Sequence, residues 1–208
     1  CCSNITNTFA KENDWLFARK TDKNGRFPRA SHWLSRRKLP TALMAEDKQA
    51  EKSAKAEVKK LRGQAKDGVL KAQFLLAVKL VNGEGVEADP KEAEKWYRKA
   101  AKRDFPPAMN NLALLYTSDA LGEPDLKAAL KWYRKAAEQG NADAQCSLGV
   151  MYYEGQGVQQ DYKAAIKLWE LAAEQEHAKA KFNLGVIYDA GEGVPQDYKE
   201  AVKWFRLA

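Results

Sequence analysis

The stretch from Ala144 to Ala173, AQCSLGVMYYEGQGVQQDYKAAIKLWELAA, decides the fold of this chain. Small and apolar residues recur at helical spacing in each half of the stretch, and the segment Gly155 to Gly157 separates the two halves. Spacing of this kind is typical of amphipathic helices that bury one face. The stretch therefore predicts a helix, a turn and a second helix.

The same pattern recurs along the chain at a step of 36 residues, without an insertion. Matching alanines stand at Ala72, Ala108, Ala144 and Ala180. A fixed period of this length is the signature of a repeat protein, in which each unit buries its apolar face against its neighbours. We assign four repeats to residues 72–107, 108–143, 144–179 and 180–208, of which the last is truncated.

The residues between the helices predict how each helix begins and ends. Asp89 is expected to cap the second helix of the first repeat, with Glu92 completing a capping box. Gly83 and its equivalents are expected to end the first helix in a left-handed conformation. The Gly-x-Gly that starts there follows a helix and not a strand, which argues against a phosphate-binding loop. The second repeat has an atypical turn, because Ser118 to Pro124 replaces the glycines.

The repeat resembles the consensus of the Sel-one-like repeat (SLR) family, which is related to the tetratricopeptide repeats. Its alanine, leucine-glycine, tyrosine, Gly-x-Gly-Val, aspartate and tryptophan positions are all present in residues 144–173, and the resemblance covers residues 72–208. It implies a right-handed α-solenoid of antiparallel helix pairs whose concave face, lined by the first helices, binds proteins or peptides. Adaptor and scaffold proteins of the bacterial periplasm, envelope or cytoplasm are typical of the family.

Positions that differ between repeats suggest where a partner would bind. These positions are the third, fourth and tenth of the first helices. Their variation has two explanations: the residues line a groove that is adapted to a ligand, or they face solvent and are under no constraint. Side-chain amides can hold an extended peptide backbone. The candidate binding residues are Asn110, Asn111, Ser147, Tyr153 and Asn183.

No catalytic set is apparent, and we expect no cofactor and no bound metal. His32 and His177 are the only histidines, and no serine, cysteine or carboxylate is placed at a spacing that predicts a catalytic dyad with either. The resemblance does raise one enzymatic alternative, because cysteine-rich relatives have been linked to β-lactam binding or hydrolysis. Ala173 stands where the partner of Cys146 would be expected, so this alternative loses support, and a nitrocefin assay would test it.

The net charge of +7 is concentrated at the N-terminal end. Residues 1–71 carry a net charge of +9 and residues 72–208 a net charge of −2. Residues 1–40 are expected to be a disordered basic leader or an arm that anchors the chain to nucleic acid or an anionic membrane. Residues 41–71 are expected to form a capping helix or the remnant of a repeat. No transmembrane segment or signal peptide is visible, and we expect the chain to be a fragment.

Overall fold

The computed structural model describes the backbone of residues 41–208 and the side chains from Lys48 onward. Contacts divide the chain into two units, residues 1–49 and 50–208, and the packing below is that of the second unit. The prediction of a disordered leader or a basic arm at residues 1–40 lies outside the described residues.

The described residues form nine α-helices and no strand, which confirms the predicted all-α repeat fold. Helices that start the repeats begin every 36 residues, and so do the helices that follow them. The helices are α2 (Thr41–Lys66), α3 (Leu70–Asn82), α4 (Pro90–Ala101), α5 (Pro106–Thr117), α6 (Leu126–Glu138), α7 (Ala142–Glu154), α8 (Tyr162–Ala173), α9 (Ala178–Ala190) and α10 (Tyr198–Leu207). We call α3, α5, α7 and α9 the first helices, and α4, α6, α8 and α10 the second helices.

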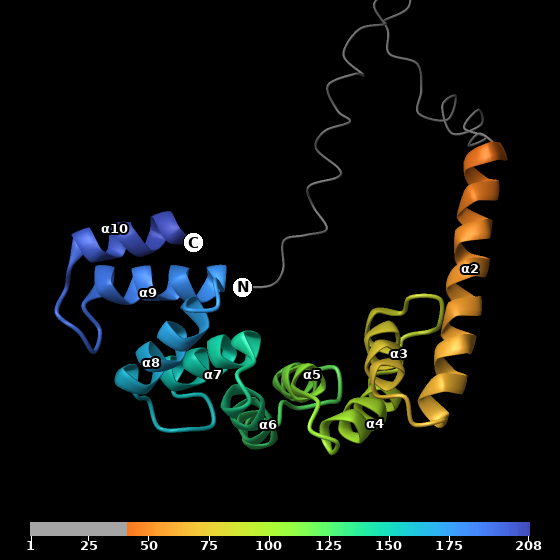
Figure 1. Cartoon of the computed structure of the whole chain (residues 1–208), viewed down its shortest axis with the longest axis horizontal. Helices are drawn as coiled ribbons and strands as arrows, with labels where there is room; N and C mark the ends of the chain where they lie inside the picture. Colours follow the sequence, from red (N-terminus) through yellow and green to blue (C-terminus); the bar gives the residue numbers. More distant parts are fainter. Residues whose placement is uncertain (1–40) are drawn as a thin grey trace, which may run out of the picture. The chain divides into compact units, whose positions relative to one another are not determined.

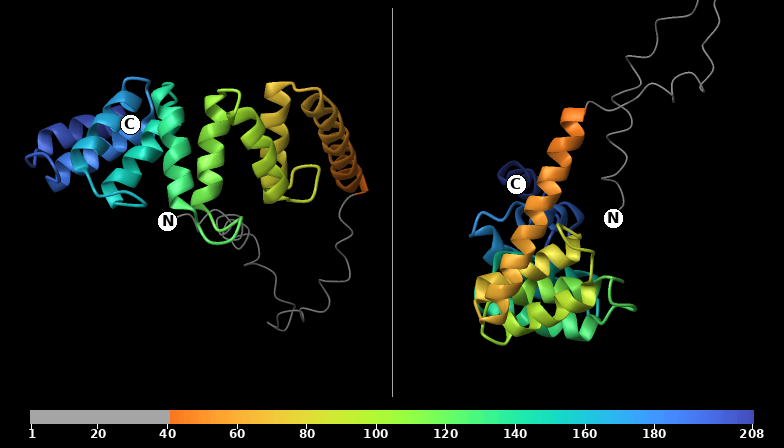
Figure 2. Two further views of the ribbon diagram at one scale, coloured as in Figure 1. Left: turned by 90° about the horizontal axis from the view of Figure 1, so that it is seen from below. Right: turned by 90° about the vertical axis from the view of Figure 1, so that its right-hand side faces the viewer.

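Each helix from α3 to α10 packs against the next helix in the chain, as in a solenoid (Figures 1 and 2). The alanines that revealed the period are buried, from Ala72 in α3 to Ala180 in α9. Small residues at these contacts let neighbouring helices approach closely, while leucine and aromatic side chains fill the remaining space. The core therefore runs along the solenoid and is divided into two adjoining clusters of buried side chains.

The turns between first and second helices follow the predicted design. An aspartate at the start of each second helix, such as Asp89 before α4, accepts a hydrogen bond from the backbone N–H three residues on. Gly83, Gly155 and Gly191 end α3, α7 and α9 with φ angles of 71°, 71° and 73°. Only glycine adopts this left-handed conformation without steric cost.

The turn of the second repeat differs in its backbone and keeps its closing hydrogen bond. Ser118 ends α5 in an extended conformation, with φ −92° and ψ 167°. Even so, the N–H of Asp125 donates to the carbonyl of Tyr116 at 2.9 Å, and Asp161 makes the equivalent bond to Tyr152 at 2.9 Å. The backbone thus returns to the same register at the start of α6.

The capping box predicted at α4 is only half formed. The N–H of Glu92 donates to Oδ1 of Asp89 at 2.8 Å, as expected. The carboxylate of Glu92 does not return to the N–H of Asp89, which donates to the carbonyl of Leu80. It accepts hydrogen bonds from Arg62 of α2 and from the indole N–H of Trp96. The side chain therefore ties α4 to α2, and the reciprocal part of the prediction was wrong.

Residues 50–66 of α2 contact α3 as a second helix contacts the first helix that follows it. Nε2 of Gln73 in α3 donates to the carbonyl of Ala65 in α2 at 3.1 Å. Nε2 of Gln145 in α7 makes the same bond to Ala137 in α6 at 3.3 Å. The two pairs are 72 residues apart, or two repeats. The capping helix or remnant repeat expected for residues 41–71 stays a prediction, and both alternatives are compatible with this contact.

Gly149 should resist substitution because of the tryptophan packed against it. A Cβ atom on Gly149 would lie 2.4 Å from Nε1 of Trp169, whose N–H is bonded to the carbonyl of Cys146 at 3.1 Å. Overpacking costs about 1–3 kcal/mol and exceeds the gain of about 1 kcal/mol in helix propensity. We expect Gly149→Ala to lower the free energy of unfolding, measured by urea denaturation, by about 1 kcal/mol.

Two comparisons control this prediction. Gly63 is an exposed glycine inside α2 whose added Cβ would meet no atom within 4 Å. Gly63→Ala should therefore raise the free energy of unfolding by roughly 0.5–1 kcal/mol. At the positions equivalent to Gly149 and Trp169, the first two repeats carry alanine and tyrosine, as in Ala77 and Tyr97. Trp169→Tyr should accordingly remove the cost of Gly149→Ala, and a cost that persists in the double variant would contradict the steric explanation.

Candidate functional site

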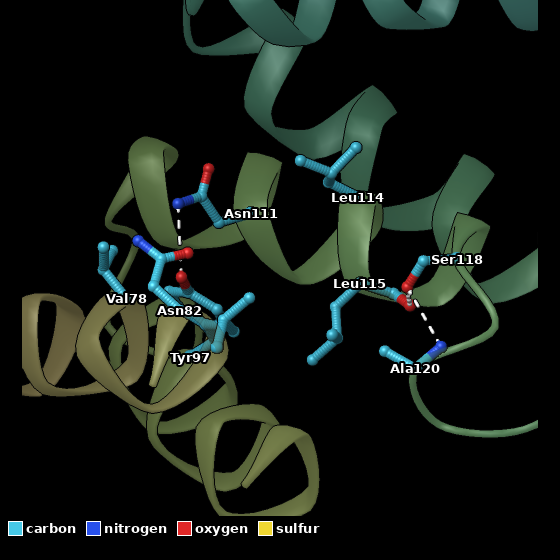
Figure 3. A pocket seen from close by; sticks show the side chains of 9 residues that line it. Val78, Asn82, Tyr97, Asn111, Leu114, Leu115, Ser118 and Ala120 are labelled. Carbon is cyan, nitrogen blue, oxygen red and sulfur yellow. Dashed lines mark hydrogen bonds between the residues drawn. The ribbon is translucent and has the colours of Figure 1, made fainter. Parts of the chain in front are cut away.

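A groove lies between α3 and α5, with the second helix α4 below it (Figure 3). Its volume is about 390 Å³ and its walls are mainly apolar. The lining residues are Val78, Val81, Asn82, Tyr97, Asn111, Leu114, Leu115, Ser118 and Ala120. We call it the α3/α5 groove. Its walls come from two successive repeats, so neither repeat could form it alone.

Two polar groups meet within this groove. Nδ2 of Asn111 donates to the phenolic oxygen of Tyr97 at 3.3 Å (Figure 3). Burial raises the pKa of Tyr97, and the hydrogen bond from Asn111 opposes the shift. Oδ1 of Asn111 accepts a hydrogen bond from Nδ2 of Asn110 at 3.2 Å. The amide group of Asn111 is therefore held in orientation, with one N–H left for a ligand.

A second groove repeats this arrangement two repeats further along the chain. It lies between α7 and α9, has a volume of about 110 Å³, and we call it the α7/α9 groove. Its lining residues are Val150, Tyr153, Glu154, Trp169, Asn183 and Val186. Each of these six residues stands 72 positions after a residue of the α3/α5 groove. The two grooves are thus the same structural site in two different repeats.

One position carries a much larger side chain in the α7/α9 groove than in the α3/α5 groove. Tyr153 stands where the α3/α5 groove has Val81, and its ring packs 5.7 Å from the ring of Trp169 and 5.5 Å from that of Tyr162. A hydrogen bond to the side chain of Glu192, together with burial, raises the pKa of Tyr153 to about 12. The phenol is therefore neutral and fixed in place, and it narrows the α7/α9 groove.

Asn183 borders the α7/α9 groove and also reaches the preceding first helix. Its Nδ2 lies 3.9 Å from the sulfur of Cys146, within the range of a weak hydrogen bond. Burial raises the pKa of the Cys146 thiol to about 11, so the sulfur is neutral at pH 7. A protonated, buried thiol is a poor nucleophile, and Cys146 packs in the core as a small apolar residue.

The structure brings three of the five predicted residues into the grooves. Asn111 lines the α3/α5 groove, and Tyr153 and Asn183 line the α7/α9 groove. Ser147 stands at the equivalent position between them, one repeat from each asparagine. Asn110 lines neither groove, although its Oδ1 is buried and has no hydrogen-bond partner among the described residues.

Sequence reasoning missed the apolar and aromatic walls of the grooves. Val78 and Val150 belong to a position that is aliphatic in all four repeats yet lies outside the alanine and leucine stripe of the core. An aliphatic residue that recurs outside the core stripe is the sequence signal that could have identified the groove walls. Tyr97 and Trp169 are buried in the core, and each also lines a groove.

His177, considered as a catalytic residue, holds the start of α9. Its Nδ1 accepts a hydrogen bond from the N–H of Ala180 at 3.2 Å, and its Nε2 lies 3.1 Å from Oδ1 of Asp143. Nδ1 must be unprotonated to accept this bond, so Nε2 carries the proton and donates to Asp143. Asn141 caps α7 at the equivalent position. The histidine thus acts as a structural cap.

The described residues, 41–208, contain no helix that is long and apolar enough to span a bilayer. The comparison with curated proteins found no match. A family model described as the Sel1 repeat matches residues 70–105, 106–141, 142–177 and 178–208. These ranges have the predicted step and begin two residues before the repeats assigned from the sequence, where the first helices start.

Several solved structures resemble this chain. A protective antigen of uropathogenic Escherichia coli with an SLR fold is 37% identical, with a TM-score of 0.67 over 71% of this chain and 32% of that chain. A Sel1 repeat protein from Oxalobacter formigenes is 31% identical, with a TM-score of 0.68 over 74% of this chain and 63% of that chain. An immunity protein from Pseudomonas aeruginosa is 26% identical, with a TM-score of 0.53 over 72% of this chain and 55% of that chain. This chain thus spans less than two thirds of each of them.

Proposed function

The chain belongs to the Sel1 repeat family, and from this premise we propose that it binds an extended peptide segment of a partner protein along its first helices. Proteins of this family are generally protein-interaction scaffolds. The observation that carries the proposal is the recurrence of one groove, with the same six positions, at α3/α5 and at α7/α9. An extended chain that crosses several repeats meets both grooves.

The chemistry of the grooves indicates which peptide they would accept. Aliphatic and aromatic walls favour apolar side chains, which gain about 25 cal/mol per Å² of apolar surface removed from water. Asn111 and Asn183 stand beside these walls and can bond the peptide backbone through their amides. The α3/α5 groove is the larger of the two, so we propose that it takes a large apolar side chain and that the groove narrowed by Tyr153 takes a smaller one.

The proposed activity is binding without catalysis. Among the described residues, the one cysteine is a buried neutral thiol, and the one histidine caps a helix through its ring nitrogen. The thiol contacts the amide of Asn183, and both ring nitrogens of the histidine are engaged, one by the N–H of Ala180 and the other by Asp143. No nucleophile among the described residues is hydrogen-bonded to this histidine. These features support a scaffold in preference to the β-lactam-handling alternative, which a nitrocefin assay on this chain still tests.

A selected peptide ligand would test the role of the two asparagines. We expect a random peptide library, selected on the chain, to return sequences with apolar residues. Replacing both Asn111 and Asn183 by alanine should weaken binding by about 10–100-fold in calorimetry, since each lost hydrogen bond is worth about 0.5–1.5 kcal/mol. Helical circular dichroism should not change, because both side chains are only partly buried.

The control is Gln139→Ala, which removes an exposed side-chain amide at the end of α6, away from both grooves. It should leave the affinity unchanged within twofold. If the double asparagine variant binds the peptide with the same affinity as the wild type, the proposal is wrong. A library that yields no peptide binding above background would do so as well.

A further inference from the structure

The second helices α4 and α6 carry two rows of lysines on their outer side, away from α3 and α5 (Figure 1). Lysines four residues apart lie on one side of a helix, and here that side is opposite the buried one. All six side chains are exposed, and none forms an ion pair among the described residues. We call these residues the lysine face: Lys91, Lys95 and Lys99 in α4, and Lys127, Lys131 and Lys135 in α6.

The carboxylates nearest to the lysine face have other partners. Glu92 accepts a hydrogen bond from Arg62 of α2, and Glu94 accepts one from the hydroxyl of Tyr116 of α5. The charge of Lys95 acts on both carboxylates at longer range. Helix α6 has no acidic residue before its last one, so its three lysines are the less compensated row.

This arrangement of charge does not stabilise the helices that carry it. Like charges four residues apart repel each other, and each row contains two such pairs. Lys91 and Lys127 also lie in the first turn of their helices, where the helix dipole favours acidic side chains. The rows thus impose a cost on the free protein that an anionic partner would offset.

The net charge of −2 over residues 72–208 conceals a strong separation of charge. The four second helices carry 13 Lys and Arg against 5 Glu, whereas the turns that precede them carry 9 acidic residues and no basic one. Lys163 and Lys167 continue the rows into α8, where Leu171 takes the third position. The full pattern is therefore confined to α4 and α6, and the lysine face is a local basic surface.

The side chains around the lysine face indicate the kind of anion that it suits. Arg98 and Arg134 are engaged, because each donates to the phenolic oxygen of a tyrosine in the next first helix. The rings of Trp96 and Trp132 are covered by lysine ammonium groups, which lie 4.2 Å and 5.3 Å from the ring centres. The free cations of this surface are thus all lysines, with no uncovered tryptophan ring beside them.

These features favour a bilayer over a nucleic acid. Nucleic acid sites usually combine arginines, which pair with phosphate through two N–H groups, with exposed aromatic rings on which bases stack. Lysine acts instead as a point charge, and clusters of about four to eight basic residues suffice to attract an anionic bilayer. A bilayer also needs no cleft, and none of the six lysines lines either peptide groove.

We propose that the lysine face binds a phospholipid surface rich in anionic headgroups. Contact through the outer side of α4 and α6 leaves the two peptide grooves between the first helices open to their ligand. The proposal does not depend on peptide binding, so variants of Asn111 and Asn183 should leave lipid binding unchanged. Failure of either proposal does not affect the other.

Vesicle binding by the whole chain tests the proposal. The vesicles contain phosphatidylcholine with about one third phosphatidylglycerol, and pure phosphatidylcholine vesicles are the comparison without net charge. Replacing Lys91, Lys95, Lys127 and Lys131 by glutamine should weaken co-sedimentation with the anionic vesicles at least tenfold. Thermal stability should be unchanged or higher, because like-charge pairs are removed.

The matched control removes the same number of lysines from exposed positions outside the lysine face, and it should bind within twofold of the wild type. Both variants keep residues 1–40, so any binding by that basic segment is the same in the two. Equal vesicle binding by the two variants would overturn the proposal. The control substitutions are Lys59→Gln, Lys60→Gln, Lys71→Gln and Lys179→Gln.

Acetylation of lysines, followed by mass spectrometry, locates the contact on the wild-type chain. Anionic vesicles should slow the acetylation of the lysine face several-fold and leave that of Lys71 and Lys179 unchanged. Absence of this protection contradicts the proposal. Duplex DNA that binds more tightly than the vesicles, through the same four lysines, would assign the face to nucleic acid and overturn it. A dimer that the four glutamine substitutions abolish would assign the face to a second copy and overturn it as well.

Discussion

Trp169→Ala should lower the free energy of unfolding by about 3–5 kcal/mol, the usual range for truncating a buried tryptophan. The side chain is 2% exposed and packs over Gly149. Because glycine has no side chain, it cannot fill the space that truncation of Trp169 would leave. Its N–H donates to the carbonyl of Cys146 at 3.1 Å, so truncation also leaves a buried acceptor without its partner. Chemical denaturation followed by circular dichroism measures the loss.

Trp132→Ala is the matched control, because the same residue type is removed one repeat earlier. Trp132 is only partly buried, and its ring lies 5.3 Å below the ammonium group of Lys135 on the outer surface of α6. We expect a smaller loss, of roughly 1–2 kcal/mol, from reduced apolar burial and the lost cation–π contact. Equal losses for the two variants would show that burial in the core does not account for the role of Trp169.

Leu112→Ala should cost about 2–5 kcal/mol of unfolding free energy, the range measured for leucines deleted from well-packed cores. Leu112 is fully buried in α5, which packs between α4 and α6 near the middle of the repeats. In a solenoid each repeat is stabilised by its neighbours, so a cavity in an inner repeat weakens the interfaces on both sides. Urea denaturation should show a lower midpoint and a broader transition than the wild type.

Leu114→Ala tests whether burial decides this effect. Leu114 is on the same helix, two residues away, but it is 57% exposed and forms part of the wall of the α3/α5 groove. Its replacement should change the free energy of unfolding by less than about 0.5 kcal/mol, as is usual for surface positions. It should weaken peptide binding several-fold instead. A large loss of stability for Leu114→Ala would contradict the packing described for α5.

The helices and their ends were accessible from the sequence because both depend on local interactions. A helix is held by bonds between residues four apart, and an aspartate such as Asp125 or Asp161 caps it through a backbone N–H three residues away. The glycines that end α3, α7 and α9 are recognisable for the same reason. The fourfold repetition then reinforced each local signal, since an accidental pattern would not recur every 36 residues.

Glu92 shows where local reasoning failed. Its position three residues after Asp89 favoured a capping box, which is a contact within one turn of helix. The structure places Arg62 of α2 beside the same carboxylate, with a hydrogen bond of 2.8 Å between Nη2 and Oε2. The pairing also lowers the pKa of Glu92. A partner 30 residues away cannot be identified from spacing along a helix.

The candidate site was accessible only in part. Comparison of the repeats selected Asn111, Tyr153 and Asn183, since a position that varies within a constant framework is free to serve binding. It also selected Asn110, which lines neither groove, because variation alone does not distinguish neighbours on a helix that point in different directions. Tyr97 and Trp169, whose aromatic rings line the two grooves, were not predicted as site residues.

The sequence by itself determined the repeat, its 36-residue period, the helix pairs and the residues that start and stop them. Only the tertiary structure decided which side chains share a groove and that Tyr153 lines one of the grooves. The physical reason is that helix formation follows from contacts a few residues apart. A groove arises from the packing of side chains that are tens of residues apart in the chain.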